Sequence, residues 1–135
     1  MMQTKRCNRL DDFLMKKMLN SEKNYFSDEE RYQAYRNFLR LTTKEGKRIA
    51  ATQTIKKWFG IGGIKRPNRE GLFKIGFDLR LSVKEMEELF VYVMREPDFQ
   101  INDYREMIFL YGFYHQMTYD DCIKMIDCFE KSLPG

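Results

Sequence analysis

Apolar residues recur at helical spacing along almost the whole chain, and this periodicity limits the fold more than any other feature. Residues three and four positions apart share one face of an α-helix. The stripe Met86, Leu89, Phe90 and Val93 is a clear example, and the alternating pattern of a half-buried strand is nearly absent. The sequence therefore predicts an all-α fold, a compact domain of six or seven short helices.

Several helix starts can be placed from their caps. A Ser or Thr followed three residues later by an acidic residue can satisfy the free N–H groups of a first turn. This spacing occurs at Ser27 and Glu30, Ser82 and Glu85, and Thr118 and Asp121. Asn8 and Thr52 are the expected N-caps of two further helices, and Gly60 suits a left-handed C-cap. Residues 42–51, interrupted by Gly46, are expected to form only a short helix.

Length and composition indicate one domain. With 135 residues, 43% hydrophobic and 33% charged, the chain resembles an ordinary globular protein. It has no apolar run long enough to span a membrane and no secretory signal at its start. The three cysteines are expected to be reduced, which favours a cytoplasmic protein. Neither a linker nor an internal repeat is expected, and the domain is divided into N-terminal helices (1–41), a centre (42–94) and a C-terminal helical hairpin (102–132).

Charge is strongly segregated along the chain. Residues 43–70 carry eight Lys or Arg and two Glu, a net charge of +6. The preceding residues carry +3 and the following residues −5, so the overall +4 conceals the separation. Segregated charge points to an anionic partner, either a nucleic acid or an acidic protein surface.

The basic segment overlaps a motif of turn and helix residues between Ile55 and Phe90. A Gly and a Pro are followed by a helical pattern and then by L-S-x-x-E, carried by Gly63, Pro67, Arg69, Leu72, Ile75, Leu79, Leu81, Ser82 and Glu85. This segment resembles bacterial helix-turn-helix proteins of the lambda-repressor/Cro type. Asn102 to Phe129 looks like the helical tail that follows it in a set of small bacterial proteins. The Gln- or Ser-rich turn that usually precedes the recognition helix is missing from Leu39 to Thr54.

The resemblance implies a small, dimeric transcriptional regulator that binds duplex DNA. Thr52 to Phe59 would be the recognition helix, and Gln53, Thr54, Lys56 and Lys57 would face bases and phosphates. The DNA backbone would be contacted by Lys47, Arg48, Lys65, Arg66 and Arg69. The alternative is a protein-interaction adaptor on a degenerate helix-turn-helix scaffold. Such an adaptor could work in phage defence or counter-defence, although no residue argues for that context.

No enzyme is predicted. His115 is the only histidine and is better explained by its place at a helix C-terminus. One histidine and three scattered cysteines provide no metal site, and no cofactor or small-molecule substrate is expected.

The aromatic side chains of the expected helix after Asn102 can be read in two ways. Ile108 and Tyr111 lead the face expected to pack in the core. Phe109 and Phe113 lie on another face, where they would be exposed and could form a partner surface or a homodimer contact. Core packing and a partner surface both stay open for these two residues. Trp58 is expected in the core.

Overall fold

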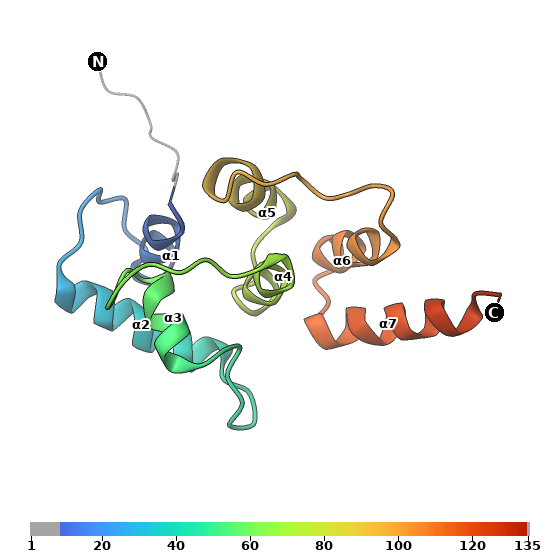
Figure 1. Cartoon of the computed structure of the whole chain (residues 1–135), viewed down its shortest axis with the longest axis horizontal. Coiled ribbons are helices and arrows are strands. Elements are labelled where there is room, and N and C mark those ends of the chain that lie inside the picture. The colour runs from blue at the N-terminus through green and yellow to red at the C-terminus, as the bar shows by residue number, and fades with distance from the viewer. Residues whose placement is uncertain (1–8, 135) are drawn as a thin grey trace, which may run out of the picture.

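The computed structural model describes residues 9–134, and most of this range is helical. No β-strand occurs among these residues, which confirms the predicted all-α class. The first three helices lie at one end and the last two at the other, with α4 between them (Figure 1). The helices are α1 (Leu10–Leu19), α2 (Asp28–Thr42), α3 (Thr52–Trp58), α4 (Arg69–Asp78), α5 (Val83–Glu88), the π-helical turn η1 (Leu89–Val93), α6 (Tyr104–Tyr114) and α7 (Tyr119–Ser132).

Three helix N-caps occur where the sequence predicts them. Ser27, Ser82 and Thr118 each accept a hydrogen bond from the backbone N–H three residues on, and the acidic residue there accepts one in return. These three capping boxes confirm the predicted starts of α2, α5 and α7. Gly60 has a φ of 77°, as expected for a left-handed C-cap. The expected cap at Asn8 lies outside the described residues.

Two local predictions are wrong. Ala51, rather than Thr52, is the N-cap of α3, and no side chain caps this helix. Residues 42–51 form no separate helix, because Lys44 and Lys47 exchange backbone hydrogen bonds of 2.9 Å across a two-residue turn. Glu45 and Gly46, the central residues, both have positive φ, which is the geometry of a tight hairpin turn.

The first part of the core joins α1, α2 and α3 around Phe38. Trp58 packs edge-on against Phe38 with ring centroids 6.0 Å apart, and Phe59 does so at 5.3 Å. All three rings are buried, so the prediction for Trp58 is confirmed. Edge-to-face packing of this kind suits the ring quadrupoles. It fixes the inner face of α3 and leaves its outer face to solvent.

The second part of the core is an aromatic cluster between α4 and α6. The Phe73 and Phe109 rings stack at 4.5 Å, and the Phe77 and Phe113 rings at 3.9 Å. Phe90 and Phe99 close the cluster from η1 and the following loop. None of the helices in residues 9–134 has the length and apolar character needed to cross a membrane.

The hairpins α4–α5 and α6–α7 are two versions of one unit, contrary to the expectation of no internal repeat. Five residues recur 36 positions later: Arg69, Glu70, Phe73, Gly76 and Phe77 become Arg105, Glu106, Phe109, Gly112 and Phe113. Each first helix ends in the same way. Arg80 and Gln116 both adopt a left-handed φ, 56° and 55°, and a capping box opens each second helix. The conserved spacing and the matching turns identify a structural repeat.

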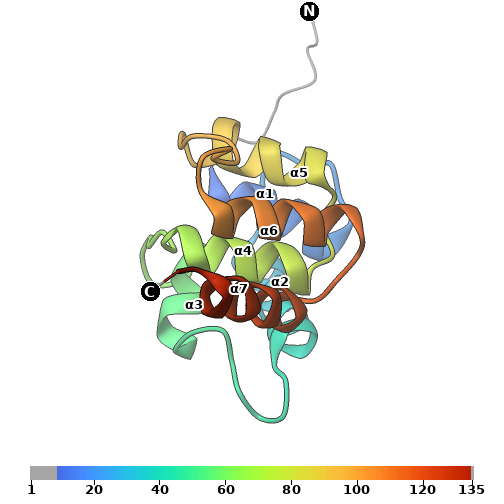
Figure 2. The ribbon, with the colours of Figure 1, turned by 90° about the vertical axis from the view of Figure 1, so that its right-hand side faces the viewer.

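The two units pack with approximate two-fold symmetry. Helices α4 and α6 lie side by side between α5 and α7, and each second helix contacts the first helix of the other unit (Figure 2). Equivalent side chains meet each other, as the two stacked Phe pairs show. The two glycines also match: a Cβ on Gly76 would meet Met86 and Phe113, and one on Gly112 would meet Cys122 and Phe77. The symmetry axis therefore runs between the two parallel helices.

Candidate functional site

The outer face of α3 carries the central residues of the predicted site. Gln53 is exposed, and Thr54, Lys56 and Lys57 are partly buried. Gln53, Lys56 and Lys57 share one face because they lie three and four positions apart. The Lys56 ammonium is 5.7 Å from the centre of the Tyr35 ring, a cation–π contact that directs this side chain along α2.

A buried polar cluster fixes the end of α3 against the rest of the bundle. The Arg31 guanidinium donates to the Phe59 carbonyl at 2.9 Å and to the Asp11 carboxylate at 3.1 Å. Asp11 is itself buried. One arginine of α2 thus joins α1 to the C-terminal end of α3, and α3 is held as a rigid part of the fold.

Lys47, Arg48 and Lys65 lie in the connections before and after α3, and all three are exposed. Within residues 9–134, no carboxylate lies within 4.0 Å of these cations or of Lys56 and Lys57. None of these five charges is therefore neutralised by an ion pair within residues 9–134. We call these five residues the α3 cations.

Two other cations of the basic segment are already engaged. Lys44 pairs with Asp78 at 3.0 Å, where burial raises the pKa of the carboxyl group and Lys44 opposes that rise. Arg66 donates to the backbone carbonyl of Met94 but is otherwise exposed. Of the two, only Arg66 retains an open charge that could contact a phosphate.

Arg69 is a correction to the predicted site, because its guanidinium is used inside the protein. It binds both oxygens of Glu106 at 2.6 and 2.8 Å and donates to the carbonyls of Pro97 and Asp98, each at 2.8 Å. It also lies 4.1 Å from the centre of the Phe90 ring. Hydrogen bonding to Glu106 raises the pKa of Arg69, so its charge is permanent but internal. Arg69 holds the loop after η1 to α4 and α6 and is unavailable to DNA.

The predicted exposure of Phe109 and Phe113 is also wrong. Both rings are buried, since α6 turns this face toward Phe73 and Phe77 of α4. Tyr111, which was expected in the core, is exposed, and its ring centre lies 4.1 Å from that of His115 in a tilted arrangement. Phe109 and Phe113 therefore belong to the core, and the homodimer contact expected from them is not available.

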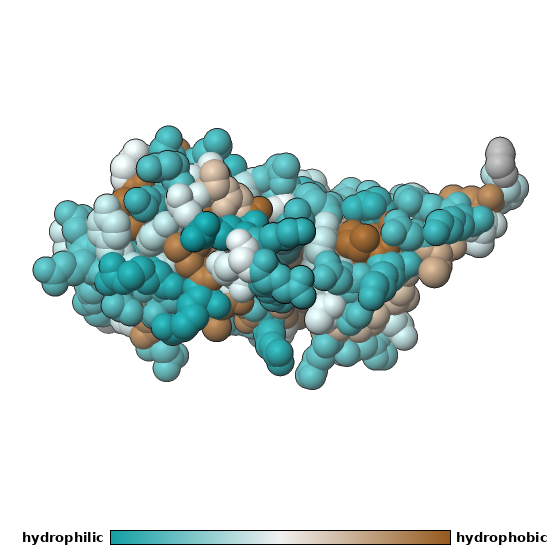
Figure 3. Space-filling view, turned by 90° about the horizontal axis from the view of Figure 1, so that it is seen from below, coloured by the Kyte–Doolittle hydropathy of each residue, from teal (hydrophilic) through white to brown (hydrophobic). Residues whose placement is uncertain are grey.

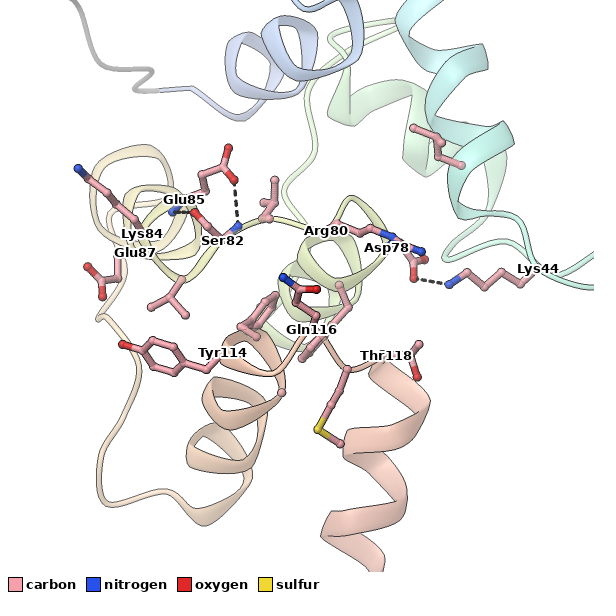
Figure 4. A pocket seen from close by; sticks show the side chains of 17 residues that line it. Lys44, Asp78, Arg80, Ser82, Lys84, Glu85, Glu87, Tyr114, Gln116 and Thr118 are labelled. Carbon is pink, nitrogen blue, oxygen red and sulfur yellow. Dashed lines mark hydrogen bonds and ion pairs between the residues drawn. The ribbon is translucent and has the colours of Figure 1, made fainter.

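A groove that the sequence did not predict lies where the turns of the two repeat units meet (Figure 4). It has a volume of about 1190 Å³ and is lined by equivalent residues of both turns, including Arg80 with Gln116 and Ser82 with Thr118. Tyr114 and the Lys44–Asp78 pair lie at its sides. Both acidic and basic side chains line the groove, and none of the α3 cations is among them. No three potential metal ligands gather anywhere in residues 9–134.

Comparison with protein-family models, with curated proteins and with solved structures finds no match for this chain. The resemblance to helix-turn-helix repressors therefore stays a prediction. The local geometry bears on it in one respect: α3 and α4 are joined by a long connection, residues 59–68, whereas the short turns of a helix-turn-helix unit occur in α4–α5 and α6–α7.

Proposed function

We propose that this chain binds duplex DNA through α3 and the α3 cations and acts as a small transcriptional regulator. The observation that supports the proposal is the group of five positive charges without carboxylate partners around one short, rigidly held helix. Duplex DNA presents closely spaced phosphates, and cations in this arrangement release counterions when they bind. Gln53, exposed on the same face, has the amide needed to recognise an adenine edge in the major groove.

The distribution of charge in the protein indicates which of its ends would face bound DNA. The α3 cations lie at the end formed by α1, α2 and α3, and the acidic C-terminal residues follow at the other end in α6 and α7 (Figure 1). Figure 3 shows that hydrophilic residues dominate the lower face over α2 and α3. A DNA backbone would be attracted to the α3 end and repelled from α7.

The first prediction concerns salt. If the α3 cations neutralise about five phosphates, affinity for duplex DNA falls roughly 10²- to 10³-fold between about 50 and 200 mM salt. Fluorescence anisotropy with a labelled, mixed-sequence duplex measures this dependence. Absence of binding at the lowest salt, with the chain folded, would contradict the proposal.

The second prediction identifies the cations responsible. We expect the Lys56→Gln, Lys57→Gln double variant to weaken binding to all duplexes and to lower the salt slope by about two. The matched control is Lys124→Gln with Lys131→Gln, which removes two exposed charges from α7. If the control loses as much affinity as the α3 variant, the interface is not on α3.

An acidic protein surface is the second candidate partner, favoured by Tyr32. This ring is exposed beside Lys56, whose ammonium is 6.0 Å from its centre. Tyrosine is enriched in the cores of protein–protein interfaces. Tyr32→Ala distinguishes the partners: it should leave the affinity for duplex DNA unchanged and weaken an acidic protein partner.

A further inference from the structure

We propose that the tip of the connection between α3 and α4 enters the minor groove of A·T-rich DNA and inserts Ile64 between two base pairs, while α3 lies in the neighbouring major groove. The loop tip consists of Gly62, Gly63, Ile64 and Lys65, which are all exposed. This inference rests on the proposed binding of duplex DNA. It adds a second contact to that function, together with a preferred type of sequence and a bend in the bound DNA.

The loop tip is anchored at both ends and stands clear of the protein between them. On the α3 side, the Ile61 N–H donates to the Lys56 carbonyl at 3.0 Å. On the α4 side, the Arg66 guanidinium donates to the Met94 carbonyl. A Cβ on Gly62 would meet nothing within 4 Å. The loop tip is therefore a projection with fixed ends, and its exposed atoms are free to contact another molecule.

The loop tip lies beside α3. In Figure 2 the connection and α3 occupy the same side of the molecule, at the left edge. A Cβ on Gly63 would lie 3.8 Å from the Cε atom of Lys57, so the Lys57 side chain extends from α3 to the loop tip. In duplex DNA a line of phosphates separates each major groove from the minor groove beside it. With α3 in the major groove, Lys57 meets these phosphates and the loop tip reaches the minor groove.

The chemistry of the loop tip matches an A·T-rich minor groove. Ile64 is 73% exposed, and isoleucine is one of the apolar side chains that minor-groove proteins insert between base steps. Within residues 9–134, the backbone N–H groups of residues 62–65 donate to no protein acceptor. A·T pairs present only acceptors in the minor groove, whereas G·C pairs add an amino donor. Because TA steps also unstack easily, they are the expected site for Ile64.

Replacing guanine by inosine tests the minor-groove contact. Inosine lacks the amino group that guanine presents in the minor groove and keeps the major-groove acceptors of guanine. At about 50 mM salt, the full chain should bind a G·C-rich duplex at least about fivefold more tightly after this replacement, as measured by fluorescence anisotropy. Equal affinity for the two duplexes would overturn the minor-groove contact and leave the proposed binding through α3 intact. Failure to bind any duplex would overturn the proposed function and this inference with it.

Energy transfer between dyes at the two ends of a TA-rich duplex tests the role of Ile64. The full chain should bend this duplex by about 20–90°, and Ile64→Ser should lose most of the bend. Ile101→Ser is the matched control, because Ile101 is 78% exposed in the connection before α6, away from α3 (Figure 1). This control should bend the duplex as the unchanged chain does. A duplex that stays straight with the unchanged chain, or a bend that persists with Ile64→Ser, would overturn the insertion of Ile64.

Discussion

The Arg69→Ala variant is expected to lose about 3–5 kcal/mol of folding free energy. Its guanidinium pairs with Glu106, and the two side chains are only 24% and 9% exposed. Removing the arginine leaves a buried carboxylate without its cation and also frees the carbonyls of Pro97 and Asp98. Urea unfolding followed by circular dichroism measures the loss.

The internal repeat provides the control for this variant. Arg105 and Glu70 are the equivalent pair, but both side chains are 38% exposed and their closest atoms are 3.3 Å apart. Arg105→Ala should therefore cost only about 0–1 kcal/mol. Replacing the buried pair as a whole, by Arg69→Met with Glu106→Leu, should cost less than Arg69→Ala alone. Equal losses for Arg69→Ala and Arg105→Ala would show that burial does not decide the effect.

Gly112→Ala is expected to destabilise the fold by about 1–3 kcal/mol, despite the better helix propensity of alanine. A Cβ at this position would lie 2.2 Å from the Cys122 sulfur and 3.2 Å from the Phe77 ring. Cys122 is fully buried, so its sulfur has no free space to enter. The melting temperature and the urea midpoint of the variant should both decrease.

Removing the sulfur should relieve this clash. In the double variant Gly112→Ala, Cys122→Ala, the new methyl group at position 112 takes the space left by the Cys122 sulfur. We therefore expect it to be more stable than Gly112→Ala alone. Gly76→Ala, the equivalent substitution in the first unit, should also be destabilising because its Cβ would meet the Met86 sulfur at 2.3 Å. If Cys122→Ala adds its own cost without any relief, the contact is not the cause.

The sequence predicted the features of this fold that depend on neighbouring residues. The capping boxes at Ser27, Ser82 and Thr118 and the left-handed Gly60 need only residues within one turn of them. The all-α class follows from the same local patterns. The expected helix in residues 42–51 failed because two positive φ angles at Glu45 and Gly46 favour a tight turn over a helix.

The features that were missed depend on contacts between distant segments. Helix α6 is apolar on several faces, so its own periodicity could not show that Phe109 and Phe113 would be the ones to meet α4. Arg69 lies among other cations in the sequence, and its partner Glu106 is supplied by another helix. For the candidate site, the α3 cations were found from composition, but only the structure separates them from Arg69.

The repeat was missed because its two copies share few identical residues. Arg69, Glu70, Phe73, Gly76 and Phe77 recur, while most positions between and after them change type. A Ser at one cap becomes a Thr at the other, and Leu81 becomes Met117. These changes preserve side-chain size and hydrogen bonding, so the geometry of the turns is kept although the amino-acid types differ.

The contacts between the two repeat units have a consequence for how this molecule folds. Neither hairpin completes a core alone, because the ring of Phe73 is covered by Phe109 and the second helix of each unit packs on the first helix of the other. Losing one hairpin would expose the aromatic face of its neighbour to water. The C-terminal half of the chain should consequently gain and lose structure as one cooperative unit.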